Sequence, residues 1–178
     1  YAVKTISEEG EVSYSTPVAI PGAVNLELDQ EGEISPFYAD NIVYYSSSNN
    51  NGYSGSLEIA DIPESFYKDV LGYTVDNNGA LIENSDAIIK PFALMYEVKG
   101  DEKPRRAVLY NCKVTRPSIA AATEEDTSTP QTDTLDLTAT PREDNKNVKA
   151  IMTLSDTNTA AFNSFYTTVY EPSTVPSA

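Results

Sequence analysis

Apolar residues recur at every second position along most of the chain. Val24, Leu26 and Leu28 alternate with polar residues in AVNLELD. The same alternation occurs over residues 53–59, 92–98, 108–114, 135–139 and 148–154. Because successive side chains of a β-strand point to opposite faces, a period of two predicts strands with one face in the core. The sequence therefore predicts a mainly β fold.

Short turn sequences separate several of these strands and predict antiparallel neighbours. DNNG (76–79) joins GYTV to ALIE, residues 100–103 join the next two strands, and PREDNKN (141–147) joins the last two. Asn-Gly is among the strongest short signals for a hairpin turn. We therefore expect an antiparallel sheet in which strands close in sequence are neighbours.

Two segments break the alternation and predict helices. PESFYKDVLG (63–72) has Pro63 at the first helical position and Gly72 at its end, with Phe66 and Val70 four residues apart. Proline is favoured at the start of a helix and glycine just after its end. This segment is expected to be the shorter of the two helices.

The second helix is expected near the end of the chain. Asp156 or Asn158 would cap it, and Pro172 would stop it. Its apolar stripe consists of Ala161, Phe162, Phe165 and Val169. We interpret the stripe as a face packed on the sheet. The expected fold is a β-rich α+β chain: an antiparallel β-sandwich or rolled barrel with one flanking α-helix and a second short helix.

The composition excludes the commonest hydrolytic chemistry. The chain has no His, so neither a Ser-His nor a Cys-His pair can form. Its one cysteine, Cys112, cannot make an internal disulfide or a zinc cluster. GYSGS (52–56) lacks the last glycine of the nucleophile motif G-x-S-x-G. We therefore expect a protein that is not an enzyme and has no catalytic, cofactor-binding or metal-binding residues.

Charge is distributed unevenly along the sequence. The net charge is −15, and residues 1–89 contain 15 acidic residues against 2 basic ones. Residues 90–116 contain 7 basic residues against 3 acidic ones, which gives a local net charge of +4. Ordinary solvated faces are one interpretation of this pattern, and head-to-tail contact between copies is another. A protein that grips a nucleic-acid duplex is disfavoured, because grip depends on Lys and Arg at phosphates.

Two polar segments have no strand or helix pattern and are candidates for contacts with another copy. The Ser and Asn tract over residues 46–51 is predicted to be the tip of a hairpin whose arms are NIVYY (41–45) and GYSGSLEI (52–59). A solvated tip without contacts is the alternative. Residues 116–133 are small, polar and acidic, and too long for an ordinary hairpin connection. We expect both segments to become ordered only on assembly.

Eight sequence motifs in order resemble a known family. They are GAVNLELD, FYADN, NNNGYSGSLEIADIP, the LG after the first helix, GALIENSD, FALMYEVKGD, VLYNCKVTRP and TDTLDLTATPR. Their succession is similar to the major tail protein family, the phi13-type tail tube proteins of long-tailed phages of Gram-positive bacteria. The resemblance covers about residues 14–171.

The resemblance implies a structural virion protein that self-assembles into stacked hexameric rings. The rings would form the tail tube of a non-contractile, siphophage tail, in which the tape-measure protein and later the genome DNA are housed. Its partners would be itself, the tape-measure protein and tail-end proteins, with passage of DNA through an acidic lumen and no membrane contact. Assembly would take place in the host cytoplasm. The family brings no catalytic residues and no cofactor.

The expected organisation is one tail tube domain over residues 1–178. It includes an N-terminal extension (1–12), a long loop or arm (116–133) and a C-terminal tail (170–178). A carbohydrate-binding β-sandwich module of a surface protein is the alternative. The residues expected to contact other subunits are Tyr38, Asn41, Asn49, Asn50, Asn51, Tyr53, Arg105, Arg106, Arg116, Glu124, Glu125 and Asp126.

Overall fold

A computed structural model describes residues 1–32, 34–39, 42–100, 102–118 and 131–173, and for residues 34–39 and 42–48 it describes the backbone. The strands are β1 (Ala2–Ile6), β2 (Val12–Tyr14), β3 (Ala23–Glu31), β4 (Ile34–Ala39), β5 (Ile42–Ser48), β6 (Gly52–Ile59), β7 (Thr74–Val75), β8 (Leu81–Ile82), β9 (Phe92–Val98), β10 (Arg105–Val114), β11 (Asp133–Ala139) and β12 (Lys149–Thr153). The helices are α1 (Glu64–Asp69) and α2 (Thr159–Ser164). The mainly β fold with two short helices is thus confirmed.

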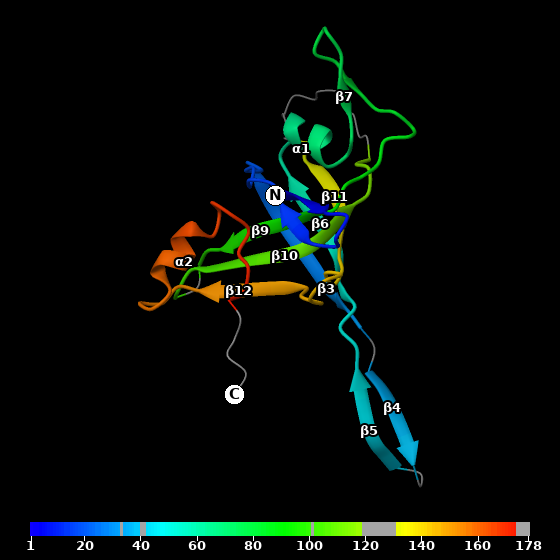
Figure 1. Ribbon diagram of the computed structural model, residues 1–178, viewed down its shortest axis with the longest axis vertical. Coiled ribbons are helices and arrows are strands. Elements are labelled where there is room, and N and C mark those ends of the chain that lie inside the picture. Colours follow the sequence, from blue (N-terminus) through cyan, green and yellow to red (C-terminus); the bar gives the residue numbers. More distant parts are fainter. Residues whose placement is uncertain (33, 40–41, 101, 119–130, 174–178) are drawn as a thin grey trace, which may run out of the picture.

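One antiparallel sheet of eight strands forms the body of the molecule (Figure 1). Its order is β2-β1-β9-β10-β11-β6-β3, and β12 also pairs with β10. The path ends at two different strands, β2 and β3, so the described sheet does not close into a barrel. The predicted antiparallel arrangement is correct, and the rolled sheet is open.

The long strand β10 is shared by two sets of partners. Its first half pairs with β12, where Arg105 lies opposite Thr153, and its last residues pair with β11, where Val114 lies opposite Leu137. β11 and β12 therefore follow one another along the same edge of β10. The prediction that PREDNKN joins two neighbouring strands is wrong, because this segment only leaves the edge of β10 and returns to it.

The other two predicted turns are confirmed. β7 pairs with β8 across DNNG, where the Gly79 φ angle is 85° and the Asp76 amide donates a hydrogen bond to the Ala80 carbonyl. β9 pairs with β10 across the connection that contains residues 100–103. Both turns join strands that are close in sequence, which is why their residues alone identify them.

A β-bulge in β10 changes which side chains share a face. The register against β9 shifts between Leu109 and Cys112. Val108 and Tyr110 lie in one apolar cluster, whereas Leu109, Cys112 and Val114 lie in the other. The predicted common face for residues 108–114 is therefore wrong. A bulge adds one residue to a strand and so reverses the alternation beyond it.

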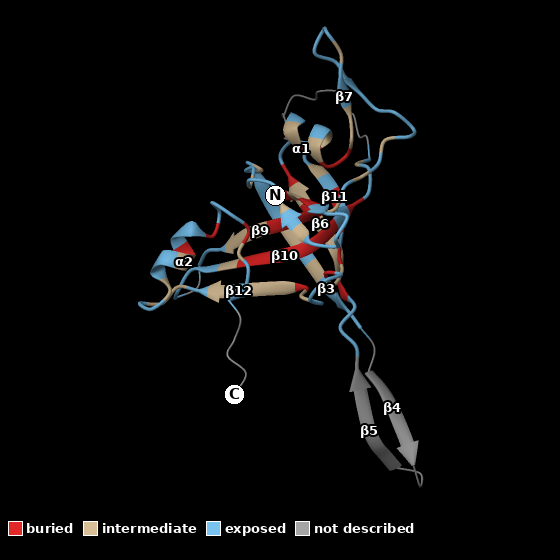
Figure 2. Cartoon of the chain, in the orientation of Figure 1, coloured by how far each residue is buried: buried red, intermediate tan, exposed pale blue. Residues whose placement is uncertain are grey.

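Two apolar cores lie on opposite faces of the β9–β10 region, and burial follows them (Figure 2). The larger core is covered by α1, whose Phe66 packs edge-on against Phe92 at 5.4 Å between ring centroids. The smaller core is covered by the segment that contains α2, through Phe165 and Val169. Helix α2 ends at Ser164, well before Pro172, so the predicted end of this helix is wrong. Of the predicted stripe only Ala161 and Phe162 lie in the helix, whereas Phe165 and Val169 are buried in the segment that follows it.

A polar cluster around the buried Lys4 and Arg142 links β1 to the loop that follows β11. Lys4 donates to Asn111 Oδ1 at 3.0 Å and forms an ion pair with Glu143. Arg142 binds both carboxylate oxygens of Glu171 and pairs with Asp144 at 2.6 Å. Because buried charges are costly unless paired, this cluster is a fixed part of the fold. Among the residues that the structure describes, no helix is long and apolar enough to cross a membrane.

The β4–β5 hairpin is a separate two-stranded sheet that extends away from the body (Figure 1). Ile34 lies opposite Ser48, so residues 46–48 belong to β5 and pair with β4. The predicted hairpin with a tip at residues 46–51 is therefore wrong. The tract ends at the base of the hairpin, where the Asn51 amide donates to the Glu31 carbonyl at 2.8 Å. Serine is tolerated in an extended strand, so a polar run alone does not specify a turn.

Candidate functional site

The outward face of β3, β6 and β11 carries polar and acidic side chains. Strand pairing aligns Glu27, Ser56 and Asp136 in one row, because each lies opposite its neighbour across the sheet. The residues that share this face, which we call the polar face, are Asn25, Glu27, Asp29, Glu31, Ser54, Ser56, Glu58, Thr134, Asp136 and Thr138. Most are exposed, and none of the three strands contains Lys or Arg.

The opposite face of the same three strands belongs to the larger core. Leu57, Leu135 and Leu137 are buried there, and Leu57 and Leu135 lie side by side across the β6–β11 pair. Alternation therefore separates the two faces cleanly. The polar face has five carboxylates, from Glu27, Asp29, Glu31, Glu58 and Asp136, and Lys113 lies at its border, opposite Thr138. It is a negatively charged surface on regular strands.

Two strand edges are left unpaired near one another. In the described part of the chain, β3 pairs only with β6, so its second edge has no ladder. β9 pairs with β1 only at Phe92 and Ala93, so its later residues pair with β10 alone. Exposed strand edges are templates for pairing with another chain. These two edges therefore could accept strands or loops from a partner.

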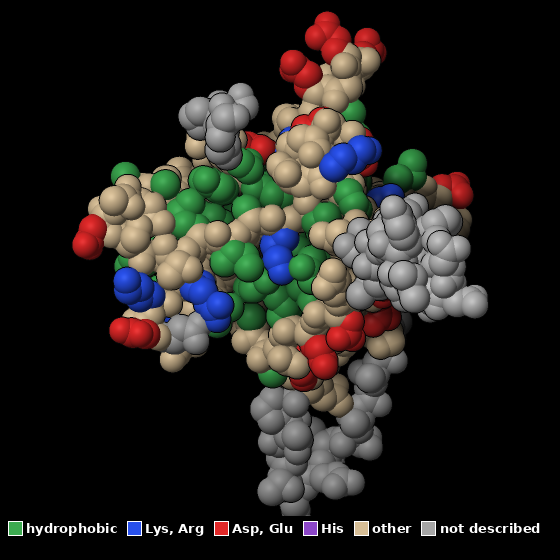
Figure 3. Space-filling model, turned by 90° about the horizontal axis from the view of Figure 1, so that it is seen from below, with side chains coloured by type: hydrophobic (Ala, Val, Ile, Leu, Met, Phe, Trp, Pro, Cys, Tyr) green, Lys and Arg blue, Asp and Glu red, His purple; other side chains and the backbone are tan. Residues whose placement is uncertain are grey.

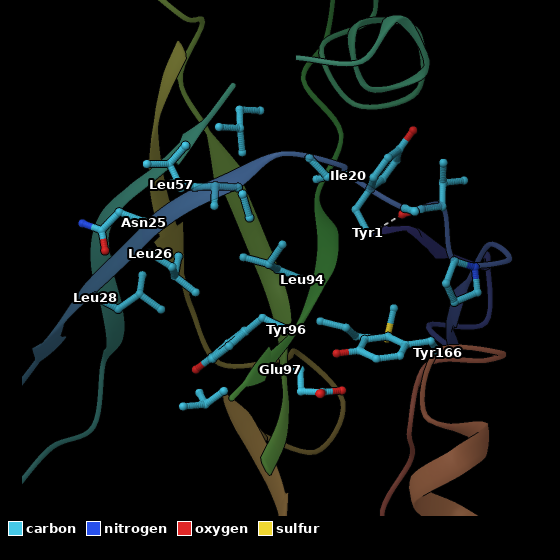
Figure 4. A pocket seen from close by; sticks show the side chains of 18 of the residues that line it. Tyr1, Ile20, Asn25, Leu26, Leu28, Leu57, Leu94, Tyr96, Glu97 and Tyr166 are labelled. Atoms are coloured by element: carbon cyan, nitrogen blue, oxygen red, sulfur yellow. Dashed lines mark hydrogen bonds between the residues drawn. The ribbon is translucent and has the colours of Figure 1, made fainter. Parts of the chain in front are cut away.

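An apolar groove lies between these two edges (Figure 4). Leu26 and Leu28 of β3 face Leu94 and Tyr96 of β9 across it, with Leu57 of β6 beside them. The groove has a volume of about 1150 Å³. Hydrophobic side chains also gather on the face of the molecule seen from below (Figure 3). A groove of this size is large enough to receive several side chains of a partner.

Two residues that line the groove, Glu97 and Tyr166, both contact Arg106. Arg106 Nε donates to Glu97 Oε2 at 2.8 Å, and its guanidinium lies 4.7 Å from the ring centre of Tyr166 and 4.2 Å from that of Phe162. Burial raises the pKa of the Tyr166 phenol. The Arg106 side chain therefore makes these contacts within its own subunit.

The structure spreads the predicted basic contact residues over different places. Arg105 is exposed on β10, whereas Arg106 is held by Glu97. Arg116 pairs with Glu83 at 2.6 Å and also donates to the Ala87 carbonyl at 3.3 Å, so it holds the segment before β9. Arg105, Arg106 and Arg116 come from one basic stretch of the sequence, but the structure gives each of them a different surrounding. Their role in contacts between copies stays a prediction.

The other predicted contact residues fall into two groups. Asn49, Asn50 and Asn51 are exposed at the base of the β4–β5 hairpin, and Asn50 Oδ1 accepts a hydrogen bond from the Gly52 amide at 3.1 Å. Tyr53 is half-buried, and its hydroxyl accepts from Lys149 Nζ at 2.8 Å. The remaining positions, namely the Tyr38 side chain, Asn41, Glu124, Glu125 and Asp126, lie outside the described residues.

The polar face and the groove were not identified from the sequence. A usable signal for the polar face exists, because the three segments 23–31, 52–59 and 133–139 lack Lys and Arg. Nothing in the sequence says that these three segments are neighbours. The groove has no local signal, since its walls come from strands about seventy residues apart. Within the ranges that the structure describes, no group of three His, Cys, Asp or Glu residues could hold a metal ion.

Comparison with known proteins gives a match at the level of the family. No curated protein and no solved structure matches the chain. The family model described as "Phage tail tube protein" matches residues 1–178.

Proposed function

The chain belongs to the phage tail tube protein family, and on that basis we propose that it self-assembles into stacked hexameric rings that form the tail tube of the virion. The family has a structural role in the phage tail, and self-association into a tube follows from it. The proposal adds the ring of six subunits, assembly in the host cytoplasm, and a bore that houses the tape-measure protein and conducts the DNA at ejection.

The observation that carries the proposal is the polar face. It is an exposed sheet surface with five carboxylates and no Lys or Arg on its three strands. Protein surfaces hold DNA chiefly through cations at phosphates, and like charge repels it. A bore lined by this face would let a polyanion slide without binding. We therefore assign the polar face of β3, β6 and β11 to the wall of the bore.

The unpaired edge of β3 supports closure of a ring. β3 lies at the end of the sheet, and in the described part of the chain the amide and carbonyl groups on its outer edge have no strand partner. Proteins cover or pair such edges, and contact between two different surfaces of identical subunits closes into a ring when the rotation fits. Placed next to one another, the subunits would continue the polar face around the bore.

The β4–β5 hairpin is the proposed contact between successive rings. It extends beyond the body of the subunit (Figure 1), and a two-stranded hairpin alone is marginally stable in water. Contact with a neighbouring ring would supply the missing packing. The segment over residues 116–133, of which 119–130 lie outside the described residues, is proposed as the second contact of this kind.

Electron microscopy of the purified protein tests the proposal. We expect rings and tubes, with six-fold symmetry in end-on class averages. A protein that stays monomeric at millimolar concentration, or a ring with another number of subunits, would contradict it. A stable monomer that binds a carbohydrate column would instead favour the alternative module.

A further inference from the structure

The segment after α2 lies on the smaller core and is held there by side chains. Residues 165–171, which we call the strap, follow α2 and run across β10 (Figure 1). Phe165 and Val169 are buried there, and the Phe165 ring stacks on the Tyr170 ring at 5.7 Å between centroids. No backbone–backbone hydrogen bond joins residues 168–173 to another described residue. Side-chain contacts therefore decide whether the later part of the strap stays in place.

Two contacts hold the strap near its end. The Tyr110 hydroxyl donates a hydrogen bond to the Tyr170 carbonyl at 2.8 Å. Arg142 Nη1 donates to both carboxylate oxygens of Glu171, at 2.6 Å and 2.7 Å. The same guanidinium donates to Asp144 through Nε at 2.9 Å and through Nη2 at 2.6 Å. Charge-assisted bonds in pairs are strong, so Arg142 ties the strap to the loop after β11.

A second buried cation holds that loop against β1. Lys4 pairs with Glu143, the residue between Arg142 and Asp144. The side chains of Lys4 and Arg142 are only 0% and 4% exposed. The three carboxylates are more open, at 58% for Glu143, 30% for Asp144 and 47% for Glu171. Protons can therefore reach the carboxylates, and a buried cation that loses its partner is strongly destabilising.

Only the carboxylates of this cluster change charge in acid. The titratable groups that face one another come from β1, β2, β10, the loop and the strap, and they are Lys4, Tyr14, Tyr110, Lys113, Arg142, Glu143, Asp144, Tyr170 and Glu171. Below neutral pH the lysines and the arginine stay charged and the phenols stay neutral. Hydrogen bonds from Lys4 and Arg142 lower the pKa of Glu143 and of Asp144, respectively. The stabilisation from these pairs is therefore complete above about pH 5 and is lost as the pH falls below about 4.

We propose that Arg142 and its two carboxylates form a pH-sensitive latch that holds the strap on the smaller core. With Asp144 and Glu171 ionised, the latch is closed. When both take up protons, the strap leaves the smaller core while the larger core stays folded. The two cores are separate clusters, and the buried residues of the strap belong to the smaller one, so the strap can open as a local unit. The latch belongs to the single subunit and goes beyond the proposed function, on which it does not depend.

Thiol labelling tests the latch, because each core can carry one reporter. Cys112 is the single native cysteine and is buried in the larger core. A Val169→Cys substitution puts a second thiol on the strap. With a dithiodipyridine reagent, which also reacts in acid, we expect labelling at position 169 to be at least tenfold faster at pH 3 than at pH 7. Cys112 should remain unlabelled at both. Simultaneous labelling of the two positions, or no acceleration, overturns the latch.

Substitution of Glu171 separates the latch from general acid unfolding. Glu171→Gln keeps the size of the side chain but removes one of the two charges bound by Arg142. In the Val169→Cys background it should accelerate labelling at least tenfold at pH 7. The control is Asp156→Asn, which changes an exposed carboxylate before α2 that makes no contact with Arg142, and it should change the rate less than twofold. Equal rates in the two variants contradict the proposal.

The unmodified protein gives a readout that needs no substitution. Opening of the strap uncovers the smaller core, and anilinonaphthalene sulfonate fluoresces when it binds exposed apolar surface. We expect its fluorescence to rise, as the pH is lowered, before the far-ultraviolet circular dichroism of the sheet changes. Two transitions at the same pH would show that the subunit unfolds as one unit, which overturns the latch.

Discussion

Replacement of Arg106 by Ala should destabilise the isolated subunit. This differs from the expectation from the basic segment of the sequence, in which Arg106 contacts another copy. Its ion pair with Glu97 is mostly shielded, with 18% and 19% of the two side chains exposed. The guanidinium also lies over the rings of Phe162 and Tyr166 at 4.2 Å and 4.7 Å. The substitution removes all of these interactions and leaves Glu97 beside Lys99, at 3.9 Å.

The expected magnitude follows from these contacts. Removing one partner of a fully buried pair costs about 3–5 kcal/mol, and an exposed pair is worth about 0–1 kcal/mol. The Arg106 pair lies between these limits, and each cation–π contact adds roughly 0.5–1 kcal/mol. We expect a loss of about 2–3 kcal/mol in the free energy of unfolding. For a chain of this length, that is a fall of roughly 5–10 °C in melting temperature.

Urea unfolding followed by circular dichroism measures the loss, and Arg116→Ala is the matched control. The Arg116 pair with Glu83 is more open, with 39% and 45% of the side chains exposed, so its loss should cost under about 1 kcal/mol. A double-mutant cycle of Arg106→Ala with Glu97→Gln should give a coupling energy of about 1 kcal/mol or more. Equal losses in the two Arg variants, or no coupling to Glu97, would refute the reasoning.

Three further predictions concern the core, the bore and the tyrosines. Leu137→Ala should cost about 2–5 kcal/mol in urea unfolding, because Leu137 is buried in the larger core, whereas exposed Thr138→Ala should change stability little; similar losses would contradict this core assignment. Tubes of a Glu27→Lys, Asp136→Lys variant should retain DNA in a nuclease-protection assay at low salt and release it at high salt; retention by unmodified tubes would argue against the bore assignment. Burial raises the pKa of Tyr14 and of Tyr110, so these phenols contribute stability that is present below about pH 10 and is lost as the pH rises above it. Phenolate absorbance should therefore show a late group of tyrosines that ionise together with unfolding, and titration of every tyrosine near pH 10 in the folded protein would contradict this.

The features that the sequence predicts correctly are local ones. The alternation at Leu135 and Leu137 and the DNNG turn each depend on residues that are adjacent in the chain, and both are confirmed. The presence of helix α1 is also predicted correctly, since its proline, its apolar spacing and its glycine lie within ten residues, although Pro63 is the N-cap and the helix ends at Asp69. Pattern and turn chemistry are sufficient where a structure is determined by near neighbours.

The errors arise where pairing is between distant segments. The bulge between Leu109 and Cys112 depends on how β10 fits against β9, and a period of two cannot locate it. One edge of β10 pairs with β12 along its first half and with β11 at its end. This division likewise depends on β6, because β11 also pairs with β6. Arg106 was grouped with its sequence neighbours, but its ring contacts come from residues more than fifty positions away. The candidate surfaces could be found only once the sheet order was known.

The base of the projecting hairpin has a mechanical consequence for the whole tail. The β3–β6 pairing ends at Glu31 and Gly52, and the β4–β5 pairing begins at Ile34 and Ser48. Only residues 32–33 on one side and 49–51 on the other lie between these two ladders, so the arm is joined to the wall by two short connections. If the arm holds the adjacent ring, curvature of a long filament would be taken up at these connections. The channel itself would keep a constant cross-section while the filament bends.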